Sequence, residues 1–179
     1  MKTFIALTFI GILTYAYAKS SGISECKTVP AKTDFSAKKF FTGTWFVSHV
    51  QKRTSSTVCQ TFTASTSSEG KYIVEYTYQS HTGEQRNVRC EAEKGGDLKL
   101  TFTCTSGDTT FEAVFVIMST DYDNYALFYR CVSFPKGYKD DNYLVLSRAS
   151  GDQEIPASLA DLTSSLDLKS CAEIRTLVL

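Results

Sequence analysis

Short runs of β-forming residues, separated by turn residues about every ten positions, fill the chain from Gly43 to Arg148. Valine, isoleucine, phenylalanine, tyrosine and threonine dominate these runs, as is typical of strands. Regular short strands with turn signals between them indicate an antiparallel sandwich or barrel. The predicted strands cover residues 44–50, 58–64, 71–79, 85–93, 98–105, 109–118, 124–132 and 142–148.

The connections between these strands are short and contain residues that favour turns, as in His81-Thr82-Gly83, Ser106-Gly107-Asp108 and Pro135-Lys136-Gly137. Eight up-and-down strands close into a barrel, which removes the exposed sheet edges and leaves room for side chains or one small ligand. The predicted fold class is therefore all-β, an eight-stranded antiparallel barrel. The patterns leave the strand order within the barrel open.

After Arg148 the apolar pattern changes from a strand period to a helical one. The apolar positions at helical spacing are Ala157, Leu159, Ala160, Leu162, Leu166 and Leu168. Pro156 precedes them, and proline is favoured at the first position of a helix. We expect a single amphipathic C-terminal α-helix after the barrel.

The first eighteen residues have the form of a secretory signal peptide. They contain Lys2, an apolar run from Phe4 to Leu13, and small residues in Ala16-Tyr17-Ala18. We expect residues 1–18 to be removed and residues 19–179 to form one secreted domain. No later stretch reaches the roughly 18 consecutive apolar residues that a membrane span needs.

Six cysteines lie at positions 26, 59, 90, 104, 131 and 171, all within the predicted mature chain. An even number in an exported chain predicts three disulfides. The spacing contains no Cys-x-x-Cys pair, so a metal or redox site is not expected. Six cysteines allow fifteen pairings, and their spacing alone selects none of them.

Catalysis has few candidate residues in this chain. Only His49 and His81 can serve as histidine bases, and there is no Gly-x-Ser-x-Gly elbow, phosphate loop or His-Glu-x-x-His motif. Nineteen basic residues balance nineteen acidic ones, which gives no field that attracts nucleic acid or an anionic membrane. We expect no enzyme activity, no cofactor and no metal.

Three short motifs coincide with the ends of the predicted strands. Gly43-Thr44-Trp45 starts the first strand, Thr120-Asp121-Tyr122 separates the sixth from the seventh, and Arg148 ends the eighth. They match the G-x-W, T-D-Y and final-arginine motifs of lipocalins, in the calycin superfamily, which the chain therefore resembles. The resemblance implies a structural set in which the tryptophan plugs the closed end, the arginine stacks on its indole, and the turn hydrogen-bonds nearby.

A narrower resemblance covers nearly the whole mature chain. Residues 40–49, 57–63, 120–127 and 141–146 look like the salivary lipocalins of blood-feeding triatomine bugs, in the triabin and procalin group. Members of that group impair host haemostasis or inflammation by binding a clotting protease, contact-pathway proteins or small mediators. The resemblance implies the disulfides Cys26–Cys131, Cys59–Cys171 and Cys90–Cys104.

The last of these pairings can be tested against hairpin geometry. A two-residue Gly95-Gly96 turn would offset Cys90 and Cys104 by three residues along their strands. A disulfide requires Cα atoms within about 7 Å. The pairing therefore predicts a longer loop around Gly96-Asp97-Leu98 or a bulge.

A barrel interior can hold a small mediator, and side-chain parity suggests which residues would contact it. His49 shares the parity of Trp45 and Val47, which predicts an inward side chain. If the face of Glu75 and Thr77 is also inward, a carboxylate among aromatic walls can receive an amine. The residues of this candidate ligand site are Glu75, His49, Thr77, Phe115 and Tyr129.

Two alternatives bear on that site. In the opposite register Glu75 faces water while Tyr76 and Tyr78 point inward, because a shift of one residue exchanges the faces. Haem, which the related nitrophorins hold through a histidine on an early strand, is not expected. Thr77 stands where that ligand would be, and threonine offers no useful iron coordination.

The open-end loops supply a second candidate surface. They lie near residues 51–57, 80–84, 105–108 and 134–141, and they carry Lys52, Arg53, Lys136 and Tyr138. Arginine and aromatic residues are typical interface anchors, and the basic character suits an anionic partner. We call these four residues the open-end rim.

Two functions follow from the resemblance and these candidate surfaces. The first is a monomeric secreted protein that impairs haemostasis by stoichiometric binding of a host plasma or platelet-associated protein. The second is a scavenger that holds a biogenic amine, nucleotide or eicosanoid inside the barrel.

Overall fold

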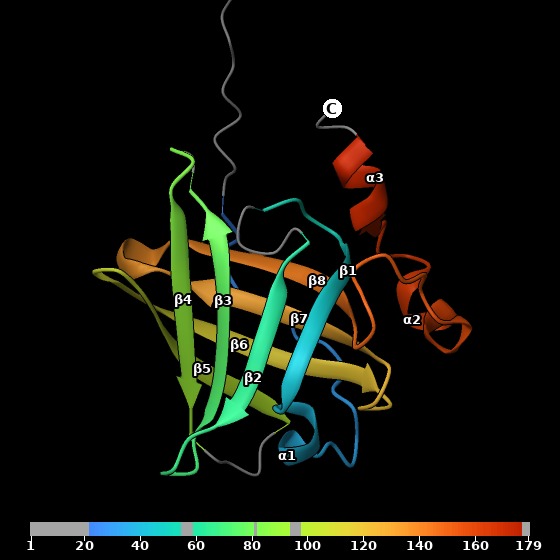
Figure 1. Ribbon diagram of the computed structural model, residues 1–179, viewed down its shortest axis with the longest axis horizontal. Helices are drawn as coiled ribbons and strands as arrows, with labels where there is room; N and C mark the ends of the chain where they lie inside the picture. The colour runs from blue at the N-terminus through green and yellow to red at the C-terminus, as the bar shows by residue number, and fades with distance from the viewer. Residues whose placement is uncertain (1–21, 55–58, 81, 94–97, 177–179) are drawn as a thin grey trace, which may run out of the picture.

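A closed antiparallel β-barrel is the main body of the computed structural model, which describes residues 22–54, 59–80, 82–93 and 98–176 (Figure 1). Its strands are β1 Gly43–Val50, β2 Thr61–Thr66, β3 Tyr72–Gln79, β4 Gln85–Ala92, β5 Lys99–Ser106, β6 Thr109–Thr120, β7 Tyr125–Ser133 and β8 Lys139–Ser147. The prediction of an all-β, eight-stranded antiparallel barrel is confirmed.

The strand order follows the chain without exchange. Each strand from β2 to β8 pairs with its neighbours in sequence, and β1 closes the barrel by pairing with both β2 and β8. In Figure 1, β1 to β4 form the front wall and β5 to β8 cross behind them. A short strand β9, Lys169–Ser170, adds to β1 next to His49 and Val50.

The barrel core follows from the two-residue period of its strands. On β5 every second residue is buried, including Phe102 and Cys104, because one face meets the core and the other meets water. On β7 and β8, in contrast, nearly every residue is buried. Their outer faces must therefore be covered by other parts of the chain.

Residues 22–34, which we call the strap, cover part of that outer face. Ile23 and Val29 of the strap pack against an outward-facing cluster that includes Val116, Tyr129 and Tyr143. The backbone N–H of Ile23 donates to the Lys139 carbonyl at 2.9 Å, and that of Lys32 donates to the Ile117 carbonyl at 2.7 Å. The strap is thus held along β6 and β8 by hydrogen bonds as well as by packing.

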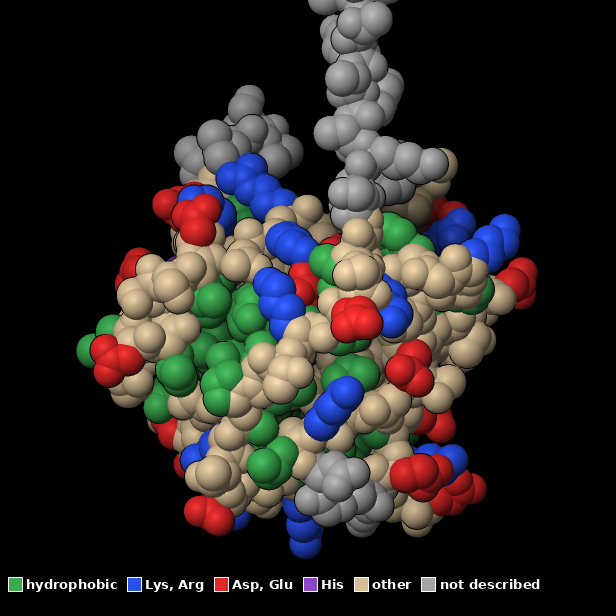
Figure 2. All heavy atoms as spheres, turned by 180° about the vertical axis from the view of Figure 1, so that it is seen from behind, with side chains coloured by type: hydrophobic (Ala, Val, Ile, Leu, Met, Phe, Trp, Pro, Cys, Tyr) green, Lys and Arg blue, Asp and Glu red, His purple; other side chains and the backbone are tan. Residues whose placement is uncertain are grey.

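Residues 149–176, which we call the C-terminal segment, cover the rest. Leu159 is fully buried against Leu127 of β7 and Val145 of β8. Figure 2 shows the rear face of the barrel, where hydrophobic side chains gather on the half that carries this segment.

The predicted C-terminal helix is present but much shorter than the sequence suggested. A 3-10 turn, Ala157–Leu159, leads into α2, Ala160–Thr163, and a separate helix α3, Cys171–Thr176, follows β9. The run Thr163-Ser164-Ser165 has low helix propensity, and Asp167 adopts a left-handed backbone with φ 47°. Leu166 and Leu168 therefore pack on the outer sheet face from non-helical backbone.

The closed end of the barrel holds the three motifs and helix α1, Ala37–Phe40. Trp45 is 1 % exposed, and its indole N–H donates to the Phe40 carbonyl at 3.1 Å. The guanidinium carbon of Arg148 lies 3.6 Å from the centroid of the Trp45 ring. The same guanidinium donates to the carbonyls of Thr44 and Tyr122, so it joins the first strand to the turn before β7.

That turn is fixed by its own side chains. Tyr122 has a left-handed backbone with φ 70°, and its N–H donates to the Thr120 hydroxyl at 2.9 Å. Asp121 accepts hydrogen bonds from the backbone N–H groups of Asn124 and Tyr125. These bonds hold the Asp121 pKa below its usual value, although its partial burial opposes them.

Three disulfides join Cys26 to Cys131, Cys59 to Cys171, and Cys90 to Cys104, which are the pairings that the resemblance implied. The first disulfide fixes the strap to β7. The second fixes Cys59, which precedes β2, to the start of α3. Cys90 and Cys104 lie directly opposite each other, with Cα atoms 3.9 Å apart. This register excludes the three-residue offset of a Gly95-Gly96 turn, and the predicted longer loop or bulge falls on residues 94–97, which lie outside the described residues.

No helix within the described ranges is both long enough and apolar enough to cross a membrane.

Candidate binding surfaces

The closed half of the barrel interior is filled by aromatic rings. Ring contacts run without interruption through Phe41, Phe102, Phe115, Phe128, Phe62 and Tyr76, with centroids between 4.7 and 6.4 Å apart. A cavity of about 20 Å³ remains there, lined in part by Trp45, Phe62 and Phe128. Small-molecule sites usually occupy about 300–1,000 Å³, so this cavity is too small for a mediator unless the rings move.

Glu75 and Thr77 point away from the interior. Glu75 is exposed and pairs with Arg89 at 2.8 Å, and Thr77 is exposed on the same outer face of β3. Tyr76 is buried in the core, and Tyr78 packs against it. The structure therefore has the alternative register, and the expectation that Glu75 and Thr77 line the cavity is wrong.

His49 also lies outside the barrel, contrary to its parity with Trp45 and Val47. The pairing of β1 with β8 shifts between Val47 and His49, so a bulge places Val50 inward in place of His49. The ring is buried beside β9, with Nδ1 3.0 Å from the Ser48 hydroxyl oxygen. Burial lowers the His49 pKa, and the charges of Glu154 and Glu173 oppose that shift.

Tyr129 was predicted as an inner aromatic wall and instead faces outward under the strap. It belongs to the outer cluster with Val116 and Tyr143, whereas Phe115 lies in the core as predicted. The sequence did not reveal this side-chain direction because both faces of β7 are buried. Phe115 is thus the one member of the predicted ligand set that the described structure places inside the barrel.

Arg130 is an interior residue that the sequence analysis missed. It lies between the core residues Phe128 and Val132 on β7, and it is only 4 % exposed. Its guanidinium donates to the Tyr76 hydroxyl at 2.8 Å and lies 5.5 Å from the centroid of that ring. Burial raises the Tyr76 pKa, and the Arg130 charge opposes the shift. The interior therefore carries a buried cation rather than the predicted carboxylate.

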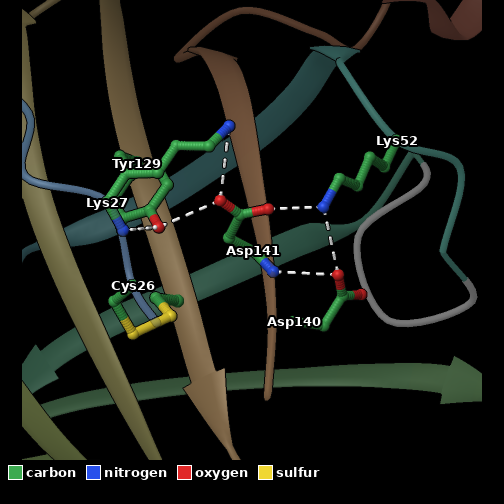
Figure 3. Close-up of a disulfide and its surroundings, with 7 residues drawn as sticks. Cys26, Lys27, Lys52, Tyr129, Asp140 and Asp141 are labelled. Carbon is green, nitrogen blue, oxygen red and sulfur yellow. Dashed lines mark hydrogen bonds and ion pairs between the residues drawn. A yellow bond between two sulfur atoms is a disulfide. The ribbon is translucent and has the colours of Figure 1, made fainter. Parts of the chain in front are cut away.

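A buried carboxylate, Asp141, binds Lys52 of the open-end rim (Figure 3). The Asp141 side chain is fully buried, accepts a hydrogen bond from the Tyr129 hydroxyl at 3.0 Å, and binds the ammonium of Lys52. The Lys27 ammonium lies 3.5 Å away, and the Lys27 backbone N–H donates to the Tyr129 oxygen at 2.7 Å. We call Lys27, Lys52, Tyr129, Asp140 and Asp141 the Asp141 network.

The electrostatics of this network favour the charged forms of Asp141 and Lys52. Burial alone would raise the Asp141 pKa, but hydrogen bonds from Lys52 and Tyr129 and the charges of Lys52 and Lys27 lower it below its usual value. Burial would lower the Lys52 pKa, and hydrogen bonds to Asp141 and Asp140 raise it instead. Lys52 is therefore held in place at the open-end rim, where it links the chain after β1 to β8.

The remaining rim residues are more accessible. Arg53 is exposed, as is Lys136, which has a left-handed backbone in the 3-10 turn Pro135–Gly137 between β7 and β8. Tyr138 is 43 % exposed, and its ring lies 5.9 Å from that of Phe134, which stacks on Phe111. Phe134 was not predicted as a site residue in its own right, yet it supports the exposed tyrosine.

Parts of the predicted open end lie outside the described residues, namely His81 and positions 55–58 of the first loop. Among the described residues, Lys52 binds Asp140 and Asp141 near the start of β8, and the turn between β7 and β8 carries Phe134, Lys136 and Tyr138. Within those same ranges no cluster of three or more potential ligands could hold a metal ion.

Comparisons with known proteins give a consistent result. A family model described as Triabin matches residues 20–161. The chain is 37 % identical to Procalin from Hospesneotomae protracta, over 96 % of this chain and 99 % of that protein. It is 28 % identical to Platelet inhibitor triplatin-2 from Triatoma infestans, over 82 % of each protein. A solved structure of LTBP1 in complex with leukotriene C4 matches with a TM-score of 0.60 and 26 % identity, over 82 % of this chain and 97 % of that one.

Proposed function

Because the chain belongs to the Triabin family, we propose that it is a secreted, non-catalytic protein that impairs host haemostasis by stoichiometric binding of a host plasma or platelet-associated protein. The name of its relative Platelet inhibitor triplatin-2 supports haemostasis as the setting. Three disulfides and a signal-peptide-like start support export, with removal of residues 1–18.

The packed interior is the observation that favours a protein partner over a small one. The ring contacts and the cavity of about 20 Å³ leave the closed half of the barrel without room for a mediator. Tyr138, Lys136 and Arg53 are instead exposed at the open end. Their basic and aromatic character suits a partner with an acidic surface.

A dose series in plasma clotting and platelet aggregation assays tests this proposal. We expect inhibition to rise with added protein, to saturate near one equivalent of the target, and not to increase with incubation time. Inhibition that grows with time at a substoichiometric dose would indicate turnover and contradict the proposal. Absence of inhibition in both assays would also contradict it.

A small mediator inside the barrel is the second candidate, and Arg130 is the residue that favours it. A buried guanidinium attracts an anion and disfavours an amine, because an unpaired second cation in a low-dielectric interior is costly. The structural match to LTBP1 with leukotriene C4 supports an anionic eicosanoid as the ligand class. Such a ligand requires the aromatic rings to move apart.

Titration calorimetry with leukotriene C4 and with tryptamine separates the two charge classes. If the interior binds a mediator, leukotriene C4 gives saturable one-to-one heat and tryptamine gives none. The substitution Arg130→Met then weakens leukotriene binding by about tenfold or more, since charge-assisted hydrogen bonds contribute about 1.5–3 kcal/mol. Equal binding of both ligands, or an unchanged affinity in Arg130→Met, would rule out this assignment of Arg130.

A further inference from the structure

A hollow of about 280 Å³ lies on the outer surface of the barrel, apart from the open end and the interior. It is bounded by the turn before β7, the end of β8 and the first residues of the C-terminal segment. Its walls include Asp123, Tyr125, Val145, Ser147, Gln153 and Glu154. Its volume lies just below the usual range for small-molecule sites, about 300–1,000 Å³.

The shape of this hollow is set by backbone contacts. The Ser147 hydroxyl accepts hydrogen bonds from the N–H groups of Ala149 at 3.0 Å and Ser150 at 3.4 Å, which direct the chain away from β8. A Cβ at Gly151 would lie only 3.1 Å from the Val47 carbonyl oxygen, so the missing side chain allows a close approach there. The segment thus returns over the sheet and encloses the space above Val145.

The charged groups around the hollow come from two separate segments of the chain. Asp123 belongs to the turn before β7, and Glu154 belongs to the C-terminal segment. Of the described residues that line the hollow, Arg148 alone is cationic. Its guanidinium stacks on Trp45 and donates to the carbonyls of Thr42, Thr44 and Tyr122, so its donors point elsewhere, although its charge still acts on Asp123.

The lining therefore combines two carboxylates with an aromatic ring and an aliphatic floor. Tyr125 is half-buried, and Val145 is fully buried against the outer sheet face. We propose that this hollow is a second binding site, which takes a small organic cation with an ammonium or amidinium group on a compact apolar body. The carboxylates would attract the charge, and Tyr125 and the half-buried Pro156 would contact the apolar part.

His49 gives a readout of where such a cation binds. Burial lowers the His49 pKa below its usual value, and the charges of Glu154 and Glu173 offset part of that shift. The His49 Nδ1 contacts Ser48, which also lines the hollow. A cation next to Glu154 cancels part of that carboxylate's field. The His49 pKa will therefore fall when the hollow is occupied, whereas a ligand in the barrel interior has no such contact with Glu154.

The experiment is a titration of the folded protein with benzylammonium, benzamidinium and uncharged benzyl alcohol, followed by NMR of the His49 ring. We expect saturable binding of the two cations, binding of benzyl alcohol at least fivefold weaker, and a lower His49 pKa in the complex. Asp123→Asn and Glu154→Gln should each weaken cation binding about fivefold, the upper range for a partly exposed ion pair. Glu75→Gln, which removes an exposed carboxylate from β3, should change nothing.

Several results would overturn the proposal. They are equal binding of benzyl alcohol, no saturation up to about 10 mM, an unchanged His49 pKa, or unchanged affinity in Glu154→Gln. Both carboxylates are exposed, so their amide variants are expected to fold, and circular dichroism of each variant checks this.

Discussion

Replacing Trp45 by alanine will lower the free energy of unfolding by about 3–5 kcal/mol, the usual cost of truncating a large buried aromatic residue. The indole is 1 % exposed, and its centroid lies 5.1 Å from that of Phe40. Its loss also leaves the Arg148 guanidinium without the ring on which it stacks. Urea denaturation at pH 7, followed by circular dichroism, measures the change.

The matched control is Phe46→Ala, which truncates the neighbouring, half-buried residue on the outer side of β1. Because less apolar area is lost there, we expect a smaller decrease in stability than for Trp45→Ala. A loss below about 1 kcal/mol for Trp45→Ala, or an equal loss for both variants, would show that the closed end does not depend on the tryptophan.

The substitution Asp141→Asn will destabilise the protein at pH 7 by about 3 kcal/mol, because it removes the anion from a buried ion pair. The Tyr129 hydroxyl then loses its carboxylate acceptor, and Lys52 keeps only Asp140. Lys52 and Lys27 are partly exposed, so water compensates part of the loss and keeps it at the lower end of the range. Asp140→Asn, at a carboxylate that is 22 % exposed, should cost about 1 kcal/mol or less.

The pH dependence of this effect has a defined sign. The Asp141 pKa is lower in the folded protein than its ordinary value of about 4. Its contribution is therefore present above that unfolded value and disappears as pH falls through the lower folded pKa. The stability difference between the wild type and Asp141→Asn should be constant near neutral pH and shrink below about pH 4. A difference that does not change on acidification would contradict the assigned role of the charge.

The sequence predicted the barrel well where one strand face meets water and the other meets the core. On β5 the alternation of buried and exposed residues is regular, and the predicted and observed strands nearly coincide. The closed-end motifs also lie where the resemblance placed them, since Arg148 stacks on Trp45 next to the Thr120-Asp121-Tyr122 turn. The strand alternation depends on local sequence, whereas the contact between Arg148 and Trp45 joins distant residues and was implied by the resemblance.

The prediction of side-chain direction failed where tertiary contacts decide that direction. Tyr129 and Arg130 lie on a strand that is buried on both faces, so hydrophobicity does not distinguish inside from outside. A bulge after Val47 reverses the direction of the His49 side chain, and residue spacing alone does not reveal where a bulge occurs. Leu166 and Leu168 end the apolar series that predicted a helix, but they pack on the outer face of the sheet from non-helical backbone.

The most direct test of the proposed function compares two variants in the haemostasis assay that the wild type inhibits. One replaces Arg53, Lys136 and Tyr138 by serine at the open end, and the other is Ala113→Trp, which places a large ring at a fully buried position inside the barrel. Circular dichroism first establishes that both variants fold. A protein binder predicts at least a tenfold loss of potency in the open-end variant and unchanged potency in Ala113→Trp. Loss of potency in Ala113→Trp with full potency in the open-end variant would contradict the account and assign the activity to the barrel interior.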